Sequence, residues 1–187
     1  MTLVASLITG CTVLPIFEES LLETAQLGDA ESQFRVAEIY REAYYDSVFG
    51  SFTLWKEAAD WYALAAEQGH AGAQYYLSVY YFTFGNHYSE SLYWVRKAAM
   101  AGVAEAQVSL GLHHAQGWGT PQDLVQAYMW IALGDEGGMS EPIDMVARLD
   151  WFVSRAEPTG EQVAEARRLK DEHTRIYGRS RSVLVYP

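Results

Sequence analysis

The chain has 187 residues, of which half are hydrophobic, so it is long and apolar enough to fold as one domain around a sizeable core. Its 24 acidic and 13 basic residues give a formal net charge of −11, which argues against a nucleic-acid-binding protein because phosphates are neutralised by clustered Lys and Arg. The acidity fits a soluble protein that attracts a basic partner. The single cysteine, Cys11, excludes an internal disulfide and a thiolate zinc cluster.

The first segment, residues 1–17, has no charged side chain. Its sequence Ile8-Thr9-Gly10-Cys11 resembles the lipobox of bacterial lipoproteins, and this resemblance implies lipidation of Cys11 and a periplasmic, outer-membrane-anchored location. The basic residues that begin such signals are absent, and the apolar run is short. Residues 1–17 are therefore either the remnant of a lipoprotein signal or an apolar N-terminal segment. A cytoplasmic location is the alternative in the second case.

A short sequence pattern recurs further along the chain. Residues 65–77 align with residues 98–110 at an offset of 33, and an earlier copy covers residues 25–36 at an offset of 41. Alanine, glycine and glutamine return in register, with a leucine in the two later copies. A tryptophan eight residues before a glycine also recurs, as Trp61 with Gly69, Trp94 with Gly102 and Trp130 with Gly138. A period of this length predicts a stacked repeat architecture.

The pattern within each copy predicts two helices. Apolar residues from Leu54 to Ala66 fall on one helical face, and small residues at positions 58, 91, 127 and at 65, 98, 134 let a neighbouring helix approach closely, with each Trp filling the space beside them. Gly28, Gly69 and Gly102 are expected to end a helix, and the next helix then begins within a few residues. A later helix is expected to start with Thr120 as N-cap and Pro121 as its first residue, with Asp123 in its first turn.

These residues carry a family resemblance. The run Trp61-Tyr62, Ala65-Ala66-Glu67-Gln68-Gly69-His70-Ala71 and Ala73-Gln74-Tyr75 is similar to the Sel-one-like repeat (SLR), a relative of the tetratricopeptide repeat. The resemblance implies an all-α fold, an α/α solenoid of about three to four antiparallel helix pairs over residues 18–138. Residues 139–177 are expected to form capping helices, with Ser140 capping one helix and Thr159 and Gln162 forming a capping box for another. Residues 178–187 form a tail.

Chemical motifs are missing from the sequence. We find no nucleophile elbow, no phosphate-binding glycine loop and no His-Glu-x-x-His helix. The adjacent His113 and His114 would point about 100° apart on a helix, which favours packing over shared metal binding. The sequence therefore predicts a non-enzymatic protein with no catalytic residue, metal site or cofactor.

A partner protein is expected in the concave surface that stacked helix pairs create. The resemblance to tetratricopeptide arrays implies that the first helix of each pair lines this groove, with Val36, Leu77 and Leu110 in the core. The expected groove positions are Phe34, Glu38, Arg41, Tyr75, Val79, Phe82, Glu105, Val108, Leu112 and Ala115. Alternatively, some of the aromatic residues pack between repeats instead.

Two functions follow from the resemblance. The first is a protein–protein interaction module of the bacterial cell envelope. The alternative is an immunity protein that neutralises a secreted antibacterial toxin, such as a phospholipase effector, by direct binding.

Overall fold

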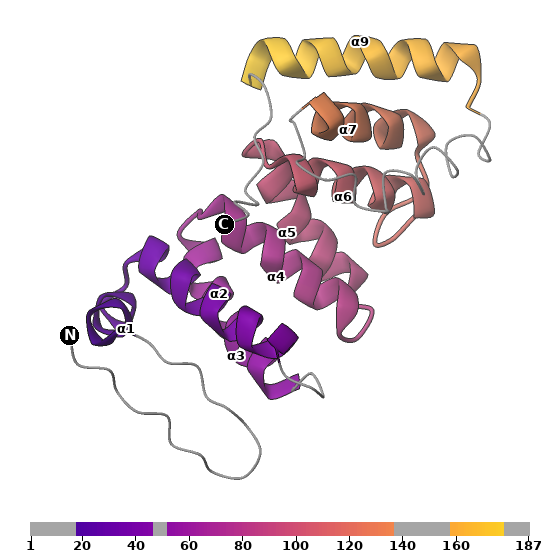
Figure 1. Ribbon diagram of the computed structural model, residues 1–187. Helices are drawn as coiled ribbons and strands as arrows, with labels where there is room; N and C mark the ends of the chain where they lie inside the picture. The colour runs from indigo at the N-terminus through magenta and orange to yellow at the C-terminus, as the bar shows by residue number, and fades with distance from the viewer. Residues whose placement is uncertain (1–17, 47–51, 137–157, 178–187) are drawn as a thin grey trace. The chain divides into compact units, whose positions relative to one another are not determined.

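A computed structural model describes residues 18–46, 52–136 and 158–177 of the chain. Over these ranges the protein forms α-helices and no strand (Figure 1), which confirms the expected all-α fold. The helices are α1 (Glu19–Gln26), α2 (Ala30–Asp46), α3 (Phe52–Glu67), α4 (Ala71–Thr83), α5 (Tyr88–Met100), α6 (Ala104–Gln116), α7 (Leu124–Glu136) and α9 (Gly160–Tyr177). The expected lipidation site Cys11, the N-cap Ser140 and the tail 178–187 lie outside the described residues.

The chain forms two compact units, residues 1–80 and residues 81–187. In the first unit α1 packs on α2 and α2 packs on α3. In the second unit α5 packs on α6, α6 on α7 and α7 on α9, so that α6, α7 and α9 lie in layers (Figure 1). Packing between sequence neighbours is what a solenoid of helix pairs requires.

The recurring glutamine joins consecutive helices in three equivalent places. Each glutamine is buried near the start of one helix, and its side-chain amide donates a hydrogen bond to a carbonyl in the last turn of the preceding helix. A helix end leaves such carbonyls without an intrahelical partner, so the glutamine supplies the missing donor. The three bonds are Gln33 to Ala25, Gln74 to Ala66 and Gln107 to Ala99, each 3.1 Å from Nε2 to O.

The recurring glycine forms the turn between these helices. Gly28, Gly69 and Gly102 have φ angles of 101°, 91° and 88°, in the left-handed region where a side chain is strained. At Gly69 the backbone makes two nested hydrogen bonds, from Gly69 N–H to Ala66 O and from His70 N–H to Ala65 O. This Schellman arrangement ends a helix and starts the next one almost at once, as the repeat predicted.

The small residues mark close helix contacts, as expected. Positions 58, 91, 127, 65, 98 and 134 are all buried. A Cβ atom on Gly134 of α7 would lie 2.6 Å from Ala104 O and 2.6 Å from Val108 Cγ2, so only glycine permits this approach of α7 to α6. Of the three tryptophans expected to fill the adjacent space, Trp130 is 6% exposed and Trp61 packs against the core cluster of Leu21, Ala25 and Val36. Trp61 and Trp94 are half-buried, and the fully buried side chains are the next residues, Tyr62 and Val95, one helical step of 100° away.

Two predicted helix starts have different outcomes. α7 begins at Leu124 rather than Pro121, and Asp123 is its N-cap, since its carboxylate accepts hydrogen bonds from the N–H groups of Val125 and Gln126 at 3.0 Å. Thr120 is therefore not the cap, because Asp123 supplies the stronger acceptor for those N–H groups. The Thr159–Gln162 capping box before α9 is confirmed, with N–H to side-chain distances of 2.8 and 3.2 Å.

Candidate partner-binding surface

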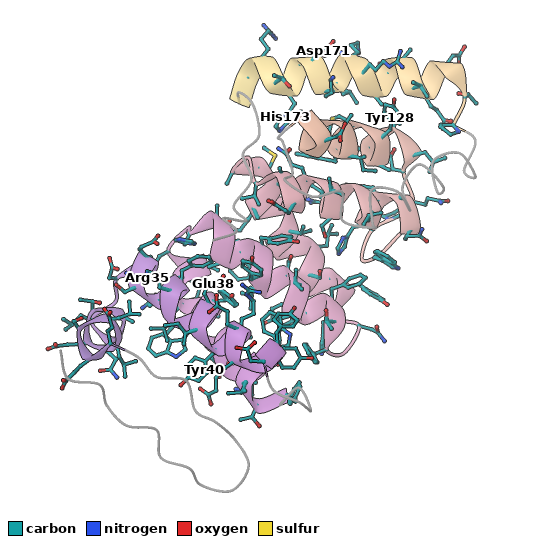
Figure 2. All side chains as sticks on the ribbon, viewed as in Figure 1. Arg35, Glu38, Tyr40, Tyr128, Asp171 and His173 are labelled. Atoms are coloured by element: carbon teal, nitrogen blue, oxygen red, sulfur yellow. The ribbon has the colours of Figure 1, made fainter. Side chains whose placement is uncertain are left out.

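Helix α2 has two sides with different neighbours in the first unit. Ile39 and Tyr40 pack against the core cluster that contains Leu21 of α1 and Val36 of α2. Glu38 leaves the helix on another side than Tyr40 (Figure 2), as residues two positions apart on a helix must. The side that carries Phe34, Glu38 and Arg41 is therefore not covered by α1.

Phe34, the first expected groove residue, is half-buried and lies on the turn between α3 and α4. Its ring stacks on the His70 ring with 4.3 Å between centroids and 24° between planes. A Cβ on Gly72 would lie 3.1 Å from Phe34 Cε2, so the glycine at this position of α4 makes room for the aromatic ring.

His70 fixes this contact by bonding through both ring nitrogens. Its Nδ1 accepts a hydrogen bond from the N–H of Ala73 at 3.1 Å, which satisfies an orphan donor at the start of α4. The hydrogen of the neutral ring is then on Nε2, which donates to Glu31 of α2 at 3.1 Å. His70 is thus a structural link between α2 and α4.

Glu38 and Arg41 form a two-pronged ion pair on the same side of α2. Arg41 Nε and Nη2 donate to the two Glu38 carboxylate oxygens at 3.0 and 2.8 Å, and the Tyr62 hydroxyl also donates to Glu38. The guanidinium lies over the Tyr76 ring at 4.8 Å and the Tyr45 ring at 5.7 Å. Burial opposes the charge of Arg41, but the hydrogen bonds and attraction to Glu38 outweigh it and raise the pKa of Arg41.

Tyr75 and Val79 extend this surface along α4. Both are half-buried, and their spacing of four residues places them on one helical face. The Tyr75 ring contacts the Tyr76 ring, with 5.2 Å between centroids. The structure thus brings five of the expected residues, all of them in the first unit, onto the contacting helices α2 and α4. We name this set the α2–α4 face: Phe34, Glu38, Arg41, Tyr75 and Val79.

The expected groove residue Phe82 belongs to an aromatic cluster of the second unit. Its ring lies 4.7 Å from Trp118, 5.5 Å from Tyr88 and 5.7 Å from His113, measured between centroids. Trp118 also stacks on Tyr88 at 6.0 Å. Phe82 therefore contributes to packing within its own unit, in agreement with the alternative that some aromatic residues pack between repeats.

The expected exposure of Glu105, Val108 and Ala115 is wrong. These side chains are 3%, 4% and 1% exposed, whereas Leu112 is half-buried. Val108 is buried because α7 approaches α6 closely at Gly134, which brings the α7 backbone against α6. The register carried over from the tetratricopeptide repeat does not anticipate how closely α7 approaches.

His113 is a buried packing residue. Its Nδ1 donates to Ser109 O at 2.8 Å and its Nε2 lies 3.1 Å from the Ser91 hydroxyl, which therefore donates to it. Burial lowers the pKa of His113. Among the described residues, no group of three or more His, Cys, Asp or Glu side chains could hold a metal ion, and none of the helices described is long and apolar enough to cross a membrane.

Sequence reasoning missed three residues that contact the α2–α4 face. Tyr45, Tyr62 and Tyr76 are not among the expected groove positions, yet all three contact Glu38 or Arg41. The spacing Glu38, Arg41, Tyr45 on one helix was the available signal, because residues three and four apart are neighbours.

Comparison with known proteins agrees with this architecture. The family model of the Sel1 repeat matches residues 30–70, 71–103 and 104–133, which is more than half of the chain and corresponds to the pairs α2–α3, α4–α5 and α6–α7. Chitin synthase regulatory factor 3 of Schizosaccharomyces pombe is 31% identical over 113 residues, 58% of this chain and 12% of the yeast protein. The chain thus spans about an eighth of that relative's length.

Two crystal structures are similar to this chain. The first is c5321, a protective antigen present in uropathogenic Escherichia coli strains that displays an SLR fold, with a TM-score of 0.71 and 24% identity over 89% of this chain and 36% of that one. The second is a Sel1 repeat protein from Oxalobacter formigenes, with a TM-score of 0.55 and 28% identity over 70% of this chain and 95% of that one.

Proposed function

Since the chain belongs to the Sel1 repeat family, whose repeats generally mediate protein–protein binding, we propose that it is a non-enzymatic adaptor of the bacterial cell envelope. It binds a partner protein through the α2–α4 face. Proteins of this fold are typically non-catalytic scaffolds. The name of the yeast relative, a regulatory factor, supports a role in which binding regulates another protein.

The observation that carries the proposal is the fixed arrangement of half-buried aromatic and charged side chains on the α2–α4 face. Arg41 is held by Glu38 and by the rings of Tyr45 and Tyr76, and Phe34 is held by His70. Tyr and Arg are the residue types that contribute most to binding at protein interfaces. Side chains that are already ordered lose less entropy when a partner binds.

The envelope location rests on the N-terminal sequence alone. Ile8-Thr9-Gly10-Cys11 resembles a lipobox, and a diacylglyceryl group on Cys11 would tether the adaptor to the periplasmic face of the outer membrane. The mass of the protein purified from its native host tests this part, since lipidation adds the acyl chains and removes the first ten residues.

Photo-crosslinking in the producing cells tests the binding surface. A benzoylphenylalanine at Tyr75 or Val79 should form a covalent adduct with one partner protein, identified by mass spectrometry. The same residue placed at Glu161 or Arg167, which are exposed on α9, serves as the control. Adducts of equal yield from all four positions, or none from Tyr75 and Val79, would contradict the proposed face.

The acidic first unit also favours the immunity function. Residues 1–80 contain 11 acidic and 3 basic side chains, and an acidic binding protein with an ordered face suits tight neutralisation of a basic toxin. The crosslinked partner separates the two functions. A partner that is a secreted toxin and forms a tight one-to-one complex with this chain would identify an immunity protein. Production of the chain together with the toxin should then suppress the toxicity. Weak binding to several envelope components would identify an adaptor.

A further inference from the structure

We infer that the partner presents a cationic protein segment. Its Lys or Arg side chains dock at the C-terminal end of α2, on the exposed residues Glu42, Tyr45 and Asp46. We call these three residues the Tyr45 edge. The inference rests on the proposed function, because it names the chemistry of the partner that binds the α2–α4 face.

The first support is the charge of the unit that carries this edge. Ten of the eleven acidic residues in residues 1–80 are exposed, and Glu38 is half-buried. Of the three basic residues, Arg41 is paired with Glu38 and Lys56 with Asp60. Residues 81–187 have 13 acidic and 10 basic side chains, so the excess of negative charge is concentrated in the first unit. Such a field attracts a cationic segment and speeds its association.

The second support is the aromatic surface within that field. Tyr45 is 63% exposed, and the Tyr44 ring meets it edge-on at 5.2 Å and 75°. Glu42 and Asp46 are three residues before and one residue after Tyr45, both exposed. A cation above an aromatic ring is attracted by the ring's negative face, and a carboxylate beside it adds a charge-assisted hydrogen bond.

The third support is Arg41, which shows that this part of α2 already accommodates a guanidinium. Arg41 lies over the Tyr45 and Tyr76 rings while Glu38 accepts its two hydrogen bonds. The guanidinium thus meets aromatic rings and a carboxylate one helical turn away from Arg41. Glu42, one helical turn before Tyr45, supplies an exposed carboxylate near the Tyr45 ring, and this carboxylate accepts from a partner rather than from the chain itself.

A peptide-binding experiment on the full chain tests the inference. The probes are fluorescent peptides of nine arginines, nine glutamates and a neutral Gly-Ser sequence, titrated at low, physiological and high salt. We expect binding of the arginine peptide alone, weakening as salt rises. The double variant Glu42→Gln/Asp46→Asn should raise the Kd by about tenfold, as for the loss of two partly screened contacts.

A matched double variant separates the Tyr45 edge from general attraction. Glu57→Gln/Glu67→Gln removes the same charge from exposed positions on α3, and it should change the Kd by no more than about twofold. Tyr45→Ala removes no charge, and it should weaken binding about threefold through the lost ring. Circular dichroism should show unchanged helix content in all three variants, because every substituted site is exposed.

The outcomes distinguish this inference from the proposed function. Equal weakening by the two double variants, an unchanged Kd for Tyr45→Ala, or no binding of the arginine peptide would overturn the cationic segment. In one outcome, benzoylphenylalanine at Tyr75 or Val79 crosslinks a partner protein, but the double variant Glu42→Gln/Asp46→Asn binds that partner as tightly as the native chain does. The proposed function then stands and the inference fails. If the peptide binds as expected but those positions capture no protein, the proposed function fails.

Discussion

Arg41 and Glu38 lie one turn apart on α2 and are joined by two hydrogen bonds, of 3.0 and 2.8 Å. Their side chains are 20% and 23% exposed, so the pair sits between solvent and core. Tyr62, whose pKa is raised by burial and by the nearby Glu38 charge, keeps its hydroxyl proton and donates it to Glu38. The ion pair is therefore part of the packing between α2, α3 and α4 as well as a surface feature.

Breaking this pair should destabilise the protein. Arg41→Met keeps the length of the side chain but removes the guanidinium, and Glu38 is left half-buried with Tyr62. We expect the free energy of unfolding to fall by about 1–3 kcal/mol, measured by urea denaturation. Lys56→Met is the control: its ion pair with Asp60 is 2.6 Å long but more than half exposed, and its removal should have no measurable effect. Equal losses would show that burial of the Arg41 pair is unimportant.

The buried glutamine of each turn should contribute through its hydrogen bond. Gln107→Leu keeps the volume, but the Ala99 carbonyl loses the donor that lies 3.1 Å away. An unsatisfied buried carbonyl costs about 1–3 kcal/mol, so thermal unfolding should occur at a lower temperature. Gln116→Leu, at the exposed end of the same helix, should leave the midpoint unchanged. Were the two variants to unfold alike, the recurring glutamine would need another explanation.

The turns and close contacts of this fold are predictable from sequence because the backbone requires them. A left-handed residue calls for glycine, and Gly28, Gly69 and Gly102 occur where the pattern placed the ends of helices. The small residues at the helix contacts were predictable for the same kind of reason. The period of 33 to 41 residues then fixes the fold class.

The binding surface was less predictable because burial depends on neighbours that are distant in sequence. Glu105 is a residue type that is usually exposed, yet it is 3% exposed. Trp94, which was expected to fill space beside the small residues, is half-buried, while the adjacent Val95 is fully buried. A rotation of one helical position exchanges groove and core, and periodicity alone does not resolve so small a shift.

A methyl group at Gly134 should be costly. In Gly134→Ala the new Cβ would meet Ala104 O and Val108 Cγ2, each at 2.6 Å, and the backbone oxygen has no freedom to move away. We expect a loss of about 1–3 kcal/mol from overpacking, despite the better helix propensity of alanine. Gly160→Ala at the start of α9, where a Cβ meets nothing within 4 Å, should be neutral or stabilising. Chemical denaturation of both variants measures the difference, and a stabilised Gly134→Ala protein would contradict the close α6–α7 contact.

His113 should make the stability of the protein depend on pH. Burial lowers its pKa in the folded state, whereas in the unfolded chain it titrates near 6.5. Just below that pH the unfolded chain binds more protons than the folded one, so the free energy of unfolding falls as pH falls. The contribution of the neutral ring is complete above about pH 6.5 and is lost as pH falls toward the folded pKa.

The variant His113→Gln isolates this effect. Its amide can donate to Ser109 O or accept from Ser91, the two partners of the imidazole, but it does not titrate. Urea denaturation from pH 7.5 to 5 should therefore show a smaller fall in stability for the variant than for the native protein. His114, half-buried next to His113 and also with a pKa lowered by burial, gives a background slope that both proteins share. Parallel pH profiles would mean that His113 takes up its proton equally in the folded and unfolded states, which its burial between α5 and α6 argues against.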